Sequence, residues 1–136
     1  MSHKAQAIVL ACIDFRFRKG LQNFLESELG LHDFDLKSDA GGVKQIVEGT
    51  PAGEWIAKNF EIAFDLHAVD RVILINHEDC GAYGGSKKFV SSQEEITFQN
   101  EQLKSAVSKL KDKYPSKQIE AYLARLSDPI RFEKVV

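Results

Sequence analysis

The residues best suited to metal binding or catalysis lie in two short segments: residues 12–16, Cys-Ile-Asp-Phe-Arg, and residues 77–81, His-Glu-Asp-Cys-Gly. The two segments hold the only cysteines of the chain, and each follows an apolar run that reads as a buried strand. Consecutive parallel strands of an α/β sheet end at the same edge, so the two segments can meet there. Cys12, His77 and Cys80 would then form a soft donor set suited to Zn²⁺, with a fourth position left for water. This predicts a catalytic zinc site rather than a closed structural one.

The composition is that of an ordinary globular protein. The length of 136 residues predicts a single domain over residues 1–136. A net charge of −2 argues against nucleic acid or an anionic membrane as a partner. No apolar run reaches the roughly 20 residues of a membrane span, and the first residues lack an apolar signal segment. Two widely separated cysteines in such a chain predict a reducing compartment, the cytoplasm.

The elements that must position the two segments alternate between strand and helix. Strands are predicted at residues 7–11, 34–37 and 71–76, and helices at residues 21–29, from Thr50-Pro51 to about residue 64, and from residue 92 to about residue 113. Residues 92–95, Ser-Gln-Glu-Glu, are predicted as a capping box that opens the last helix. Residues 119–126 and 130–136 predict a terminal hairpin. The predicted fold class is α/β: a central, mainly parallel sheet flanked by helices, with a C-terminal antiparallel hairpin.

At this point the pattern resembles a known family. Cys-x-Asp-x-Arg after a first strand and His-x-x-Cys-Gly after a later one are similar to the two signatures of the β-class carbonic anhydrases. Residues 39–42, Asp-Ala-Gly-Gly, lie where that family has an Asn-Ala-Gly turn, and the hairpin matches its last two strands. The resemblance covers about residues 5–136. Compared with the family, this chain lacks a long N-terminal helical arm and much of the insertion before the hairpin.

The resemblance implies an activity and a set of roles. Cys12, His77 and Cys80 would bind Zn²⁺, and a zinc-bound hydroxide would convert CO2 to bicarbonate. Asp14 would orient the metal-bound water and Arg16 would hold Asp14. In a second state known in the family the matching aspartate binds the metal, so Asp14 is also a candidate fourth ligand.

The resemblance further implies contacts with substrate and with a second subunit. The backbone at Gly41 and Gly81 is predicted to face the substrate, and the paired glycines of the 39–42 turn permit a close backbone approach. A homodimer or a higher homo-oligomer is expected, because the family builds its pocket across a subunit interface.

Two alternatives stay open. The first is a zinc protein on the same scaffold without hydratase activity, either a CS2 or COS hydrolase or a retired binding protein. It is suggested by Ser38-Asp39, which stands where the family has Arg-Asn and adds a carboxylate near the site. The second is a cysteine phosphatase, because Cys12 and Arg18 fit the pattern Cys-x5-Arg. Bulky Phe15 and Phe17 argue against a phosphate cradle, and this reading leaves the second segment unexplained.

Other residues of interest have plain structural interpretations. Glu78 and Asp79 are interpreted as solvated or helix-capping, and the Asp14–Arg16 pair could be an ordinary surface ion pair. Tyr83 is equally suited to line the pocket or to pack in the core. The other three histidines, His3, His32 and His67, have no ligand spacing to anything and are interpreted as surface or core residues.

Overall fold

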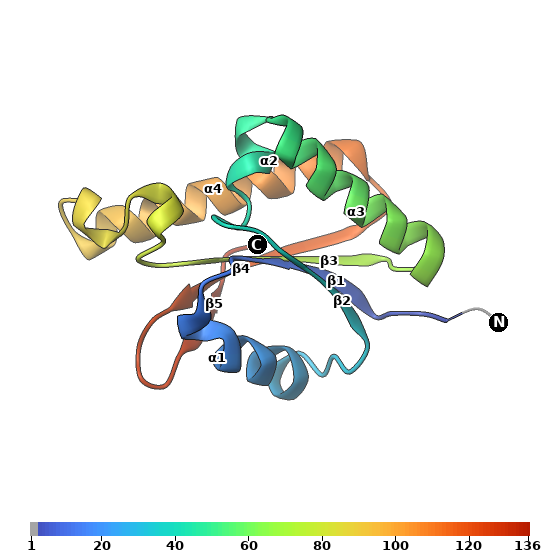
Figure 1. The fold of residues 1–136 in the computed structure, drawn as a ribbon, viewed down its shortest axis with the longest axis horizontal. Helices are drawn as coiled ribbons and strands as arrows, with labels where there is room; N and C mark the ends of the chain where they lie inside the picture. Colours follow the sequence, from blue (N-terminus) through green and yellow to red (C-terminus); the bar gives the residue numbers. More distant parts are fainter. Residues whose placement is uncertain (1–2) are drawn as a thin grey trace.

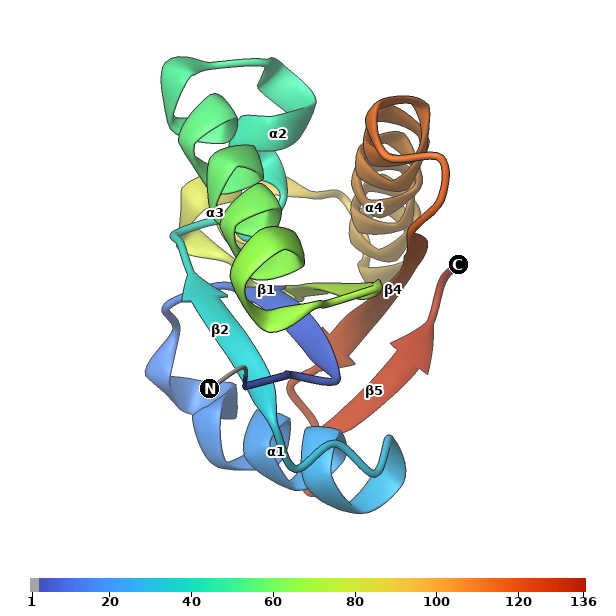
Figure 2. The same ribbon diagram turned by 90° about the vertical axis from the view of Figure 1, so that its right-hand side faces the viewer.

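The computed structural model describes residues 3–136, which form a five-stranded sheet with helices on both faces (Figures 1 and 2). The strands lie in the order β2-β1-β3-β4-β5. Their bounds are Ala7–Ala11 for β1, Phe34–Ser38 for β2, Arg71–His77 for β3, Gln118–Arg125 for β4 and Arg131–Lys134 for β5. The first four strands pair in parallel, and β5 pairs antiparallel with β4. The predicted fold class, including the terminal hairpin, is confirmed.

The helices cover the two faces unequally (Figure 2). On one face, α1 (Arg18–Asn23) follows a 3₁₀ turn, η1 (Phe15–Phe17), and continues into a π-helical segment, η2 (Phe24–Glu28). The other face carries α2 (Lys44–Glu48), α3 (Pro51–His67) and α4 (Ser92–Lys113). Two short 3₁₀ turns, η3 (Gly81–Tyr83) and η4 (Ser86–Lys88), follow β3. The sequence did not predict α2. Within the described part of the chain, no helix is both long enough and apolar enough to cross a membrane.

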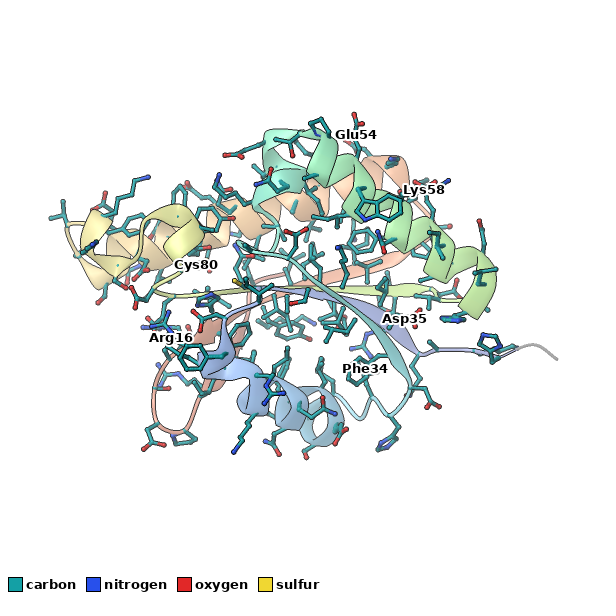
Figure 3. The ribbon with its side chains drawn as sticks, viewed as in Figure 1. Arg16, Phe34, Asp35, Glu54, Lys58 and Cys80 are labelled. Carbon is teal, nitrogen blue, oxygen red and sulfur yellow. The ribbon has the colours of Figure 1, made fainter. Side chains whose placement is uncertain are left out.

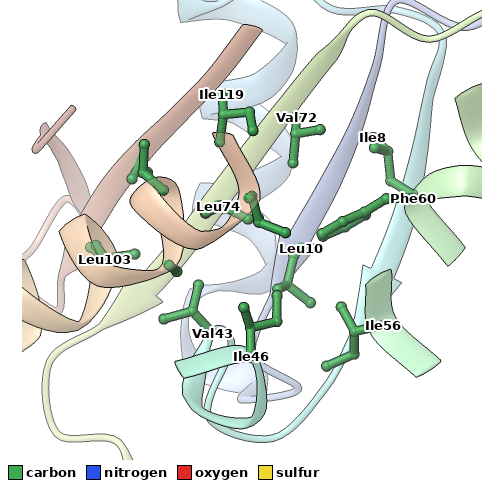
Figure 4. Close-up of a cluster of buried hydrophobic side chains, with 14 of the residues drawn as sticks. Ile8, Leu10, Val43, Ile46, Ile56, Phe60, Val72, Leu74, Leu103 and Ile119 are labelled. Atoms are coloured by element: carbon green, nitrogen blue, oxygen red, sulfur yellow. The ribbon is translucent and has the colours of Figure 1, made fainter. Parts of the chain in front are cut away.

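The central strands β1 and β3 are buried on both faces of the sheet, and this packing holds their carboxyl ends in a fixed position. Every residue of β1 is buried, as are the last six of β3. Side chains that alternate along these strands feed two apolar clusters, one on each face of the sheet. Figure 4 shows the larger cluster, in which Leu10, Leu74 and Phe60 pack between sheet and helices. Close packing on both sides makes the strands a rigid base for the loops at their carboxyl ends.

The two long helices, α3 and α4, each begin at a side-chain cap. The Thr50 hydroxyl accepts a hydrogen bond from the Gly53 amide at 3.2 Å, with Pro51 in the first helical position, as predicted. The prediction of a capping box at residues 92–95 is wrong by one residue. The cap is Ser91, whose hydroxyl accepts from the Glu94 amide at 3.1 Å. The helix cap therefore lies one residue earlier than predicted, the Glu94 side chain accepts from the Val90 amide at 2.7 Å, and Glu95 is left for another role.

The turn at residues 39–42 lies against the end of β3. Gly41 and Gly42 have positive φ angles of 85° and 57°, which favour glycine. A Cβ on Gly42 would collide with the side-chain oxygen of Asn76, and that oxygen accepts a hydrogen bond from the Val43 amide at 3.1 Å. The close approach places the turn beside the residues that follow β1 and β3.

Candidate metal centre

Strand register brings the two sequence motifs together. Ala11, the last residue of β1, pairs with Ile75 of β3, so Cys12 emerges next to His77 at the end of β3. Cys80 follows three residues later. One ligand atom from each of these three residues lies within 4.8 Å of the other two. Figure 3 shows Cys80 at this end of the sheet, with Arg16 close by.

The three side chains fit a tetrahedral zinc ion. The Sγ atoms of Cys12 and Cys80 lie 3.9 Å apart, close to the ~3.8 Å separation of two sulfurs on a tetrahedral zinc with Zn–S bonds of ~2.3 Å. The His77 Nε2 atom is buried and has no hydrogen-bond partner among residues 3–136. Its Nδ1 atom lies 2.7 Å from the Glu78 carbonyl oxygen, which requires the proton on Nδ1 and leaves the Nε2 lone pair free. A buried nitrogen without a partner beside two thiols is what a metal ligand set requires.

The two thiols differ in their pKa. The contact with Cys80, opposed by burial, lowers the pKa of Cys12 to about 4, and the Gly41 amide contributes by donating to Cys12 Sγ at 3.4 Å. The same sulfur–sulfur contact, together with burial, raises the pKa of Cys80, against the effect of the Ala82 and Tyr83 amides. A thiolate therefore forms readily at Cys12, and thiolate is the form that binds metal.

Asp14 and Arg16 form a multiply bonded pair beside the cluster. The Asp14 Oδ2 atom lies 3.7 Å from His77 Nε2. Arg16 donates to the Asp14 carboxylate from Nε at 3.0 and 3.2 Å, from Nη2 at 2.7 Å and from its backbone amide at 2.9 Å. These hydrogen bonds lower the pKa of Asp14 to about 2. Asp14 is therefore an ionised hydrogen-bond acceptor at neutral pH, aimed at the metal ligands.

Asp79 and Glu78 do more than the sequence indicated. Arg16 donates from Nη1 to Asp79 Oδ2 at 2.8 Å and from Nη2 to the Asp79 carbonyl oxygen at 2.8 Å. The Glu78 carboxylate accepts from the Leu126 amide at 2.6 Å and from Arg125 Nε at 3.2 Å. The interpretation as solvated or helix-capping is wrong for Glu78, whereas Asp79 has a side chain that is 44% exposed and that accepts from the amide of Ser86, the first residue of η4. Glu78 ties the metal-binding loop to the terminal hairpin, and Asp79 ties it to the first motif.

The predicted substrate-facing glycines differ in their surroundings. Gly41 is buried and its amide points at Cys12 Sγ, so it lies in the site. Gly81 is exposed, opens η3 with its carbonyl oxygen accepting from Gly84, and has open space beside it. Tyr83 takes the packing role: its side chain is buried, and its hydroxyl accepts from Asn76 Nδ2 at 3.2 Å.

A small cavity lies next to the cluster. Its volume is about 90 Å³, and it lies between the first motif, the start of α1 and the edge strand β2. Its lining is mostly apolar and consists of Ala11, Cys12, Ile13, Asp14, Phe17, Arg18, Leu21, Leu36 and Ser38. Nearby Asp39, the acidic residue of the 39–42 turn, lies 4.0 Å from Lys37 Nζ, which partly offsets its charge. The cavity suits a small uncharged molecule.

Fold and site together define a class: an α/β protein with a Cys–His–Cys cluster that could hold a metal ion, at the carboxyl edge of the parallel strands. A comparison with known protein families shows to which family the chain belongs. Residues 2–134 match the family described as "putative carbonic anhydrase". The chain belongs to this carbonic anhydrase family, as the sequence motifs predicted.

Individual proteins and solved structures are also similar to this chain. An uncharacterized protein of Rickettsia bellii is 28% identical over 134 residues, covering 94% of this chain and 81% of the relative. A β-carbonic anhydrase of Trichomonas vaginalis superposes with a TM-score of 0.67 at 15% identity, over 99% of this chain and 84% of the other. A tetrameric β-carbonic anhydrase of Sordaria macrospora gives 0.68 at 12% identity, over 98% and 81%. At these identities the solved structures show the shared fold.

Proposed function

We propose that this protein is a zinc-dependent carbonic anhydrase that interconverts CO2 and bicarbonate. The observation that carries the proposal is the convergence of Cys12, His77 and Cys80, with the unpartnered His77 Nε2 facing the two sulfurs. A bound Zn²⁺ would supply a hydroxide nucleophile at neutral pH by lowering the pKa of its water. Both cysteines must stay reduced for this, which fits a cytoplasmic location.

The chain's own residues would orient the reactants. Asp14, held ionised by Arg16, accepts a hydrogen bond from the attacking group and aligns it. The backbone at Gly41 and Gly81 would face the substrate from outside the small cavity, whose lining includes neither glycine. In the alternative state Asp14 would turn away from Arg16 and become the fourth ligand, which would switch activity off.

The decisive test is stopped-flow CO2 hydration on protein whose zinc content has been measured, at about pH 7 and again above pH 8. One zinc per chain with turnover that rises with pH is the expected result. One zinc with no hydration at either pH would favour the alternatives, which are a CS2 or COS hydrolase or a catalytically inactive binding protein. Protein that binds no zinc would overturn the proposal.

The phosphatase alternative gains no support from the geometry. A phosphate cradle needs several free amides around the cysteine, but the Arg16 amide donates to Asp14 and the Arg18 amide donates to the Phe15 carbonyl oxygen. The Cys12 sulfur instead faces Cys80. The cavity beside it is small for a phosphorylated substrate.

The proposed enzyme acts as a homodimer or a larger homo-oligomer. Three large apolar side chains around the site are exposed: Ile13 is 65% exposed, Phe15 82% and Leu36 55%. Exposed apolar side chains that lie together are typical of a surface that a second subunit covers. Analytical ultracentrifugation of the wild type against Phe15→Ser tests this. A monomeric wild type would contradict it.

A further inference from the structure

The buried carboxylate of Glu95, on α4, has no role in the chemistry described so far. It is only 4% exposed, and it lies one residue beyond the glutamate that completes the helix cap. Its Oε2 atom accepts a hydrogen bond from the Asp79 amide at 2.7 Å, and its Oε1 atom accepts from the Ser86 hydroxyl at 2.7 Å. A carboxylate buried at this cost is expected to stabilise something specific.

Glu95 holds Asp79 in an uncommon backbone conformation. Asp79 has a φ of +56°, in the left-handed region, which is unfavourable for a residue with a side chain. Besides the bond from its amide to Glu95, its Oδ1 atom accepts from the Ser86 amide at 2.8 Å. Asp79 is therefore fixed by main chain and side chain together.

The fixed Asp79 presents two acceptors to Arg16. Its Oδ2 and carbonyl oxygen atoms both accept from the guanidinium at 2.8 Å, while the other edge of the guanidinium holds Asp14. An ion pair as exposed as this one, with side chains 38% and 44% exposed, contributes little and is mobile on its own. The bond to a main-chain carbonyl, anchored in turn on buried Glu95, makes the arrangement rigid.

We propose that Asp79 and Glu95 are positioning residues that lock Arg16 and so set the orientation of Asp14 toward the metal ligands. Glu95 reaches from α4, Asp79 from the second motif, and Arg16 from the first. The array is thus a chain of hydrogen bonds from a buried side chain of α4 to the carboxylate beside His77. Its effect on turnover rests on the proposed function, but the lock itself does not.

The experiment measures the Arg16 Nε–H directly by ¹⁵N NMR, with Arg16→Lys to assign its signal. The variants are Asp79→Asn, Glu95→Ala and Glu95→Gln, with Glu101→Ala, exposed on the same helix, as the matched control. Asparagine at 79 can keep an acceptor for Ser86 but offers an N–H2 group to Arg16. Glutamine at 95 keeps an acceptor for the Asp79 amide and donates to the Ser86 hydroxyl, so it is the conservative rescue.

Exchange of the Arg16 Nε–H with water is expected to accelerate about tenfold in Asp79→Asn and Glu95→Ala, and to stay at the wild-type rate in Glu95→Gln and Glu101→Ala. Both loosened variants are expected to keep one zinc per chain and their far-UV circular dichroism, and to lose about tenfold in kcat at unchanged KM. Wild-type exchange rates in both loosened variants would overturn the proposal, as would loss of zinc from them, which indicates a purely structural role. If the wild type does not hydrate CO2, the proposed function fails while the exchange rates still decide this inference.

Discussion

The two ends of the sheet both gather histidine and acidic side chains, yet they differ in what those side chains still lack. At the carboxyl end, His77 is 1% exposed, and its Nε2 atom has no hydrogen-bond partner within the described part of the chain. At the amino end, His3, His32 and His67 border one surface pocket with two aspartates, Asp33 and Asp35. Figure 3 shows Asp35 toward that end, away from Cys80 and Arg16.

The difference lies in unmet bonding capacity, not in the number of histidines. His67 Nδ1 lies 2.6 Å from Asp35 Oδ2, and its ring packs 4.7 Å from that of His3, so the amino-end histidine already has a partner. Its side chain is 29% exposed, so water can reach its remaining atoms. Of the two ends as the structure describes them, the carboxyl end alone combines burial with an unpartnered nitrogen and two thiols, so its polar atoms are the ones that a ligand would satisfy.

Removing a sulfur at the carboxyl end should give the largest effect. Cys80→Ser is expected to lose bound zinc, and with it about 4 kcal/mol of the free energy of unfolding at a zinc concentration ~1,000 times Kd. Metal analysis by mass spectrometry and urea unfolding with and without zinc measure this. Retention of one full zinc equivalent by the variant would show that the ligand set is wrong.

Removing the carboxylate beside the metal ligands should affect rate rather than metal. Asp14→Ala is expected to keep one zinc per chain and to lose roughly 10²-fold in kcat for CO2 hydration, because the orienting acceptor is gone. Stopped-flow measurement at equal zinc content tests it, with Asp65→Ala, an exposed position on α3, as the control. An unchanged rate would remove the Asp14–Arg16 pair from the proposed mechanism.

The sequence predicted that Cys12, His77 and Cys80 would come together because the signals for this are local. Cys12, His77 and Cys80 each follow a strand of clear apolar pattern, and parallel strands end together. The fold class followed from the same alternation of strands and helices. The short α2 was missed because five residues next to a glycine turn carry almost no periodic signal.

What the sequence could not predict were contacts between distant segments. Nothing in the spacing shows that Asp79 would accept from Arg16 or that Glu78 would bond to the terminal hairpin. A one-residue error in the cap of α4 assigned Glu95 to the cap, which in the structure is made by Ser91 with the Glu94 amide. Either serine satisfies the pattern, and only packing decides between them.

Backbone sensitivity should also separate the site from the rest of the chain. Gly42→Ala forces a Cβ onto the Asn76 side chain at a positive φ, and is expected to cost about 3 kcal/mol. Gly30→Ala also has a positive φ, 67°, but meets no atom within 4 Å, so it should cost only about 1 kcal/mol. Urea unfolding of the two variants gives the comparison. Equal losses would mean that the 39–42 turn is not tightly held against β3.

Acid should loosen the Asp14–Arg16 pair in a defined pH window. The pKa of Asp14 is lowered to about 2 in the folded chain, below its unfolded value of ~3.9. Its ionisation therefore stabilises the fold above pH ~4, and this contribution is lost as the pH falls from ~4 toward ~2. Urea unfolding of zinc-free wild type and Asp14→Asn across this range should converge at the acid end. Parallel curves would show that Asp14 does not titrate as its hydrogen bonds indicate.

The smallest effect is expected from the amino-end histidine. His67→Ala removes a half-exposed bond to Asp35, and pairs of this kind contribute only ~0–1 kcal/mol. The variant should bind one zinc per chain and hydrate CO2 at the wild-type rate, because none of its contacts reach the carboxyl edge of the sheet. Isothermal titration with zinc makes the comparison sharp: wild type and His67→Ala should give the same stoichiometry, whereas His77→Ala should lose the high-affinity phase. A lower zinc stoichiometry in His67→Ala would mean that the amino end also binds metal, and that burial with an unpartnered nitrogen does not distinguish the two ends.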